Sequence, residues 1–194
     1  MLSQARALMT AEGYDATTME AVAQAADVSV GSLYNYFETK QALLLAVVGD
    51  ATLAVVDAGE AVVADPPSDA REAVFALMHA FTEALMGVDR SLLRRAFGIS
   101  FIEPPQDSAH LVQLDMMMVD QLRRLLEHFV AEGQVTDEVA PDEAALTLYA
   151  SFAMAVMTWI AQEDGSDGWK AMLDGQLGVV FRGLQPRPRG RKRR

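Results

Sequence analysis

The chain has 194 residues, 51% of them hydrophobic, so it can bury the core of one large domain or two smaller ones. It contains no cysteine, which excludes disulfide bonds, thiolate zinc sites and cysteine nucleophiles. The net charge of −11 is uneven, because residues 1–49 carry −3 while the last eight residues, RPRGRKRR, carry +6. This tail is either an arm that binds nucleic acid or a solvated end without a specific role.

No group of residues has the spacing of a catalytic or metal-binding motif. The histidines His79, His110 and His128 are scattered, and the sequence has neither a glycine-rich phosphate loop nor a Gly-x-Ser-x-Gly turn. We therefore expect no enzyme activity, no metal and no cofactor. The first residues form an amphipathic helical pattern rather than a secretory signal, and we expect a cytoplasmic protein.

Hydrophobic residues recur with helical spacing along the chain, which predicts an all-α fold. A first helix over about residues 2–12 ends at Gly13. A second helix runs to about residue 25 from a capping box, TTME, in which Thr17 accepts a hydrogen bond from the backbone of Glu20.

Serine and threonine caps and proline stops divide the rest of the chain. Ser29 caps a third short helix that ends near Tyr36, and Thr39 caps a fourth that runs to about Ala64. Ser68 then opens a second set of helices. These helices are predicted over about residues 68–86, 90–102, 107–132, 141–163 and 168–183.

The segment from Ala144 to Ala161 carries no charge, and its length is at the edge of what would span a membrane. It is rich in alanine and lacks flanking Lys or Arg, so we expect no membrane partner. A soluble helix that is apolar all round is buried on two sides, and we predict that one side faces a second copy of the chain. The last helix is expected to join this dimer interface through Met172, Leu173, Leu177 and Phe181.

Two short helices joined by a tight turn outline a helix-turn-helix. The segment GYDATTMEAVAQAADVSVGSLYNYFETKQALL, residues 13–44, resembles the DNA-binding domain of the tetracycline-repressor-type (TetR) family of transcriptional regulators. The matching residues are Gly13-Tyr14, Thr17-Thr18, Val22-Ala23, Val28-Ser29, Leu33-Tyr34, Tyr36-Phe37 and Lys40. The remainder of the chain is similar to the family in length, helix count and its two apolar C-terminal helices.

The resemblance implies three parts of the chain. Residues 1–45 would form the helix-turn-helix DNA-binding domain, and residues 46–184 a larger helical domain with the dimer interface and the effector pocket. Residues 185–194 would form a basic, disordered tail. Family members usually carry a basic arm before the first helix, whereas this chain begins inside that helix. Either the native start lies upstream or the basic tail substitutes for the arm.

The resemblance also implies which residues contact DNA. A tyrosine can bury its ring in a small domain and still donate to a phosphate, and Lys40 adds charge at a helix start that favours anions. Phosphate contacts are implied for Thr18, Tyr36 and Lys40. Base contacts are implied for Val30, Gly31 and Ser32, with Tyr34 reaching a base or its phosphate. Packing explains Tyr34 at least as well, whereas core packing does not require Lys40 or Ser32.

In the larger domain, apolar side chains can line an adaptable cavity for a small apolar or amphipathic effector. The candidates are Met78, Phe81, Phe97, Phe101, Met117, Met118, Met154 and Trp159. Ordinary core packing explains each of these residues singly at least as well.

These observations favour a ligand-responsive transcriptional repressor. As a homodimer formed through residues 141–163 and 168–183, it would bind a pseudo-palindromic operator in double-stranded DNA and be released by the effector. The alternative is a dimeric all-α ligand-binding or interaction protein that keeps the helix-turn-helix as a scaffold. The acidic charge balance permits this second hypothesis, because phosphate neutralisation supplies most non-specific DNA affinity.

Overall fold

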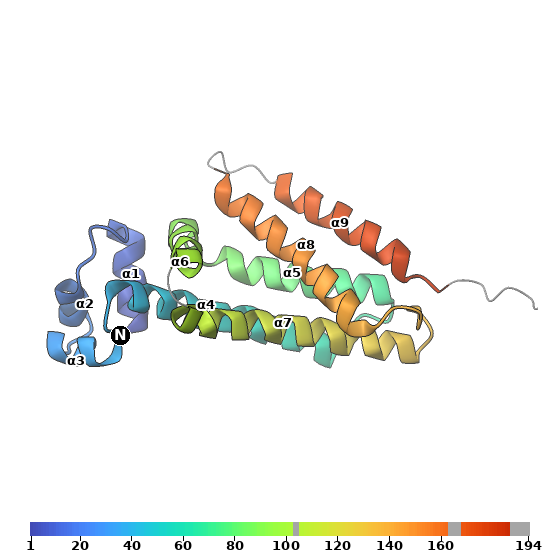
Figure 1. Cartoon of the computed structure of the whole chain (residues 1–194), viewed down its shortest axis with the longest axis horizontal. Coiled ribbons are helices and arrows are strands. Elements are labelled where there is room, and N and C mark those ends of the chain that lie inside the picture. The colour runs from blue at the N-terminus through green and yellow to red at the C-terminus, as the bar shows by residue number, and fades with distance from the viewer. Residues whose placement is uncertain (103–104, 163–167, 187–194) are drawn as a thin grey trace, which may run out of the picture. The chain divides into compact units, whose positions relative to one another are not determined.

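The computed structural model describes residues 1–102, 105–162 and 168–186, and the side chains of these residues except 100–108 and 110. Within these ranges the chain folds into helices and contains no strand, which confirms the predicted all-α class (Figure 1). In chain order the helices are α1 (Leu2–Glu12), α2 (Met19–Ala25), α3 (Val30–Tyr36), α4 (Lys40–Ala64), α5 (Ala70–Met86), α6 (Arg90–Ile102), α7 (Pro105–Ala131), α8 (Pro141–Ala161) and α9 (Gly168–Leu184).

Side-chain caps explain where the helices near the N-terminus begin. Ser29 Oγ accepts a hydrogen bond from the amide of Ser32 at 3.0 Å, and Thr39 Oγ1 accepts one from Ala42 at 3.0 Å, so both predicted caps are confirmed.

The predicted cap of α2 is wrong by one residue. Thr18 accepts from the amide of Ala21 at 3.1 Å, whereas Thr17 is buried and donates to the carbonyl of Gly13 at 2.9 Å. Thr18 therefore caps α2, whereas Thr17 closes the turn that precedes it. At α5, Asp69 rather than Ser68 caps the helix, accepting from the amide of Glu72 at 3.0 Å.

The helices form two compact units that do not follow the order of the chain. One unit comprises Met1–Asp57 and Thr82–Asp115, and the other comprises Ala58–Phe81 and Met116–Arg194. The predicted division into residues 1–45, 46–184 and 185–194 stays a prediction, and residues 187–194 of the basic tail lie outside the described residues.

The first unit contains α1, α2, α3 and the start of α4, which together form the head, residues 1–47. Apolar side chains from all four helices converge in its core, and Leu33 of α3 is fully buried. The other core residues are Ala5, Met9, Met19, Val22, Ala23, Leu43, Leu44 and Val47. Among the residues that match the family pattern, Val22, Ala23 and Leu33 are buried, while Phe37 is half-buried.

The second unit is a helical bundle built on aromatic contacts. The rings of Phe81 on α5 and Phe152 on α8 lie 5.7 Å apart, and those of Trp159 on α8 and Trp169 on α9 lie 6.1 Å apart. Gly59 of α4 packs so closely that an added methyl group would collide with Phe81 and with Gln121 of α7. The glycine therefore sets the close approach of these helices.

Helices α8 and α9 lie side by side (Figure 1). The role of the apolar residues of α9 differs from the prediction. Leu173, Leu177 and Phe181 of α9 are buried within their own unit, so their predicted place in a dimer interface is wrong. Each is needed for intrachain packing, which hydrophobicity alone cannot distinguish from packing against a second copy. Met172 is half-buried.

Two helices are long and apolar enough to cross a membrane by length and composition alone. These are α4 and α8, in which 61% and 44% of the apolar window is buried inside the fold. Burial of this kind is what core helices of a bundle show, because their apolar surface is covered by neighbouring helices.

Candidate nucleic-acid interface

Helix α3 is held with one side in the core of the head and the other exposed. Leu33 is fully buried, whereas Gly31, Tyr34, Asn35 and Tyr36 are exposed. The tight turn before α3 contains Asp27 with a positive φ of 54°, a conformation that Asp adopts more readily than most residues. This turn and the Leu33 anchor together present a short helix whose outer face is open to a large ligand.

Two tyrosines dominate the exposed surface of α3. Tyr34 is 43% exposed and Tyr36 is 70% exposed, although tyrosine is an aromatic residue that usually buries much of its ring. Tyr36 contacts the half-buried Phe37, with ring centroids 6.4 Å apart. Packing therefore leaves most of Tyr36 and part of Tyr34 uncovered, and the hydroxyl group of an exposed tyrosine can donate to an anion.

The hydroxyl groups that were predicted to contact DNA differ in whether they are already hydrogen-bonded within the chain. Thr18 accepts the capping bond, so its own hydroxyl proton can still be donated to a phosphate oxygen. Ser32 is half-buried and its Oγ lies 2.8 Å from Ser29 Oγ, so this hydroxyl takes part in the cap of α3. Val30 is half-buried and offers only apolar surface.

Lys40 forms a clamp on the turn between α1 and α2. Its Nζ donates to the carbonyl oxygens of Tyr14 at 3.0 Å, Asp15 at 3.3 Å and Thr17 at 3.0 Å. The ammonium group also lies 4.5 Å from the centroid of the Tyr14 ring. The expectation that packing does not require Lys40 is therefore wrong, because its donors tie the start of α4 to residues more than twenty positions earlier. Its phosphate contact stays a prediction.

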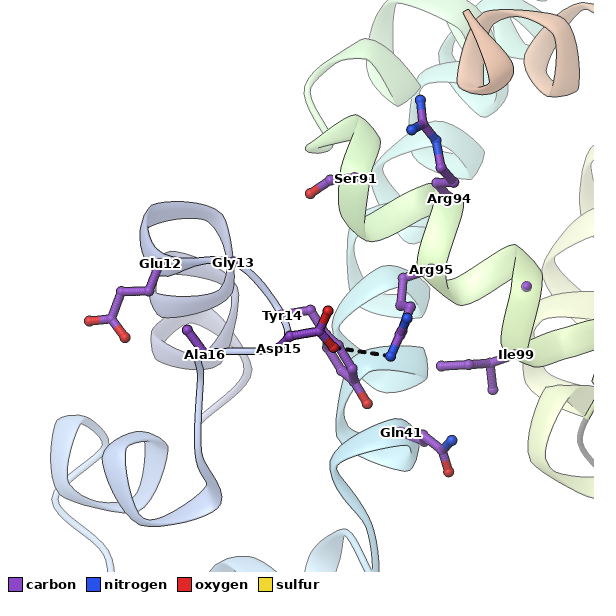
Figure 2. A pocket seen from close by; sticks show the side chains of 11 residues that line it. Glu12, Gly13, Tyr14, Asp15, Ala16, Gln41, Ser91, Arg94, Arg95 and Ile99 are labelled. Atoms are coloured by element: carbon purple, nitrogen blue, oxygen red, sulfur yellow. Dashed lines mark hydrogen bonds and ion pairs between the residues drawn. The ribbon is translucent and has the colours of Figure 1, made fainter. Parts of the chain in front are cut away.

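Helix α6 approaches the same turn within the first unit, as Figure 2 shows. Arg95 donates to Asp15 at 3.0 Å, and its guanidinium lies 4.9 Å from the centroid of the Tyr14 ring. Burial raises the pKa of the Tyr14 hydroxyl, and the charge of Arg95 partly opposes this shift. Tyr14 thus contacts Lys40 and Arg95. Because the Arg95–Asp15 pair is largely exposed, it contributes little to stability and can exchange.

The predicted effector residues do not gather at one described cavity. A surface pocket of about 870 Å³ is lined by Tyr14, Asp15, Gln41, Arg95 and neighbouring residues of the first unit, and none of the eight candidates lines it. Met78, Phe81, Met118 and Trp159 are buried, whereas Phe97, Met117 and Met154 are exposed. The side chain of Phe101 lies outside the described residues. The effector pocket therefore stays a prediction.

A short helix with an open outer face, set in a helix-turn-helix, is the arrangement that many DNA-binding regulators use. Residues 1–47 match the model of the bacterial regulatory proteins of the tetR family. Over 169 residues the chain is 25% identical to the HTH-type transcriptional repressor KstR of Rhodococcus jostii (strain RHA1), covering 86% of this chain and 74% of that protein. The head is therefore similar to the DNA-binding domain of this family, and the longer match extends the similarity to most of the chain.

Solved structures share the fold along the chain. FadR of Thermus thermophilus, a TetR family repressor solved in complex with lauroyl-CoA, matches with a TM-score of 0.74 at 20% identity, covering 100% of this chain and 97% of that one. FadR of Bacillus subtilis, solved in complex with stearoyl-CoA, matches with a TM-score of 0.70 at 16% identity, covering 95% and 97%. At these identities the likeness shows the fold alone.

Replacing Lys40 tests the clamp. Lys40→Met keeps an apolar stem but removes the ammonium, and we expect the free energy of unfolding of the free protein to fall by about 1–3 kcal/mol. Urea unfolding followed by circular dichroism measures this change. Arg6→Met is the matched control, because Arg6 is exposed and is the other cation of residues 1–49. Equal stability of Lys40→Met and wild type would contradict a stabilising role of the clamp.

Proposed function

We propose that the chain is a ligand-responsive transcriptional repressor whose helix α3 enters the major groove of operator DNA. The observation that carries this proposal is the orientation of α3, which buries Leu33 and leaves both of its tyrosines exposed. Recognition helices of this motif contact base edges in the major groove, while the preceding helix crosses the backbone. The regulator acts by binding and release rather than by catalysis, in the cytoplasm where operator DNA is accessible.

In this proposal the outer surface of the head divides into backbone contacts and base contacts. Thr18 and Tyr36 donate to phosphates, since each has a hydroxyl on the exposed surface. The start of α3, Val30–Ser32, lies against the bases, and Tyr34 reaches a base or its phosphate. Lys40 contributes mainly by holding the turn, because its donors already meet carbonyl groups.

A second copy of the chain would bring two heads to one operator. Helix α8 exposes a stripe of apolar residues, among them Leu146 at 54% and Met157 at 46%, and α9 exposes Val179 at 61%. Exposed apolar surface of this kind on two packed helices is typical of a homodimer interface. A dimer would place two α3 helices about 34 Å apart and therefore read a pseudo-palindromic operator.

For the effector we propose a long-chain acyl-CoA thioester. Two relatives of the same fold were solved with such ligands, lauroyl-CoA and stearoyl-CoA. The class combines an apolar tail with an anionic headgroup, so it meets the expectation of an amphipathic effector, and methionine-rich helices such as α7 suit flexible acyl chains.

The alternative function is a dimeric ligand-binding or interaction protein that binds little DNA. The charge of the head favours it, because residues 1–49 carry net −3 and Lys40 is engaged within the chain. The two functions differ in what replacing Tyr36 does. Only the repressor needs this side chain, which packing leaves 70% exposed.

We expect the protein to bind the region upstream of its own gene more tightly than scrambled DNA of the same length, and more weakly as salt rises. Fluorescence anisotropy at two salt concentrations measures both effects. Tyr36→Phe removes one hydroxyl and should weaken binding about 10-fold or more, as expected for a hydrogen bond to a charged group. Equal binding to both DNAs by the wild type would favour the alternative function.

The dimer interface is tested by placing charge on the apolar stripe. Leu146→Glu and Met157→Glu should shift the protein from dimer to monomer in sedimentation velocity, because an unpaired carboxylate is costly to bury. The same variants should weaken operator binding, since a monomer reads only one half-site. Val112→Glu is the matched control, because Val112 is an equally exposed apolar residue on α7. Dimers that persist in both α8 variants would place the interface elsewhere.

Lauroyl-CoA tests the effector class. It should raise the melting temperature of the protein and weaken operator binding by about 5- to 150-fold, the range of a typical allosteric coupling energy. Free CoA and free laurate are the controls for the headgroup and the tail. If lauroyl-CoA raises the melting temperature while operator affinity stays constant, the ligand binds but is not the effector.

A further inference from the structure

The DNA-reading surface of the head contains no cationic side chain. Residues 16–39, which include α2, the turn and α3, contain neither lysine nor arginine. The commonest specific contact in the major groove is an arginine or lysine that donates to the O6 and N7 atoms of guanine. Helices α2 and α3 cannot make this contact. Helix α3 itself, VGSLYNY, contains no charged residue, so any base that it reads directly must be read by a neutral side chain.

Helical geometry shows which neutral side chain lies at the centre of the outer face. At about 100° per residue, Gly31 and Asn35 lie roughly 160° from the buried Leu33, one on either side of the line opposite it. Both residues are exposed, as this geometry requires. Asn35 is not among the residues that match the family pattern. Its position four residues after Gly31 nevertheless indicates, from the sequence alone, that both residues lie on the same face of the helix.

The absence of a side chain at Gly31 gives Asn35 access to bases. Helical side chains lean toward the N-terminus and cover the preceding turn of their own helix. One turn before Asn35 stands Gly31, whose missing side chain leaves the carboxamide unobstructed and lets the backbone approach the base edges. A recognition helix contacts bases mainly with its N-terminal part. Asn35 is the sixth of the seven residues of α3, and its side chain leans from there toward that part of the helix.

The other side chains of α3 are less suited to distinguishing bases. The Ser32 hydroxyl lies 2.8 Å from Ser29 Oγ and takes part in the helix cap, and Val30 is apolar and half-buried. Tyr34 and Tyr36 lie on opposite sides of the helix, roughly 100° and 60° from Leu33, and are therefore farther from the centre of the outer face than Asn35. Asn35 is the one carboxamide in α3.

We propose that Asn35 is the specificity-determining residue of α3 and that it reads an adenine in each operator half-site. Its Oδ1 accepts a hydrogen bond from the adenine N6 amino group, and its Nδ2 donates to adenine N7, the bidentate pairing that asparagine makes in the major groove. This inference rests on the proposed function, since it names the base that the DNA-reading surface recognises. It implies an operator whose directly read core is an A·T pair.

The test selects binding sites from double-stranded DNA with a randomised core, using the full chain and its variants in parallel. The wild type should enrich a motif with one adenine per half-site, and replacing that adenine should weaken binding about 5- to 150-fold. Asn35→Ala should bind all four bases at this position within a few-fold of one another. Alanine is a stronger helix former than asparagine, so this exposed substitution should keep the fold.

The second part of the test changes the base preference instead of removing it. Asn35→Arg should change the preferred base at this position from adenine to guanine, because arginine donates to guanine O6 and N7. Gln113→Ala, which removes an exposed carboxamide from α7, is the matched control and should retain the wild-type motif. A base preference at this position that both Asn35 variants leave unchanged would overturn the inference while leaving the proposed function intact. Failure of the wild type to enrich any motif would overturn both.

Discussion

The arrangement of the head depends on the bonds between Lys40 and the turn that joins α1 to α2. One ammonium group meets three backbone carbonyls, of Tyr14, Asp15 and Thr17, that would otherwise lack a helical partner. Because Lys40 begins α4, these bonds fix the start of that long helix against the first two helices. Helix α3, joined to α4 through Phe37–Thr39, is thereby held with Leu33 inward and its tyrosines outward.

A weaker contact reaches the same turn from α6. Arg95 pairs with Asp15 and lies against the ring of Tyr14, which Lys40 also contacts. The Lys40 bonds are partly shielded, whereas the Arg95 pair is exposed and screened by salt. The turn is therefore held firmly by the start of α4 and loosely by α6, which lies later in the chain.

The sequence was sufficient to predict the helices of the head. Hydrophobic spacing and caps placed α1, α3, α4 and α6 within a residue of their bounds, because these signals are local. It could not predict the role of Lys40, since its partners are carbonyls 23 to 26 positions away and carbonyls have no sequence signature. It also misassigned Leu177, because an apolar residue on a two-sided helix can face either its own bundle or a second copy.

The acidic charge of the head should weaken its affinity for DNA of any sequence more than its preference for one sequence over another. With net −3 over residues 1–49, the head itself gains little from counterion release, so in the proposed repressor the contribution of the head would come from hydrogen bonds and from the pairing of two heads in a dimer. Neutral donors on α3, the two tyrosines and Asn35, suit this mode. Such a regulator would discriminate strongly between sequences while holding non-specific DNA weakly.

The most direct test of the account is hydrogen exchange of the full chain, free and bound to the DNA selected from the randomised pool. We predict slower exchange on binding in residues 18–21 and 30–36, with little change in α8 between Pro141 and Ala161. Protection confined to α8 and α9, with residues 30–36 unchanged, would contradict the claim that α3 is the DNA-reading element.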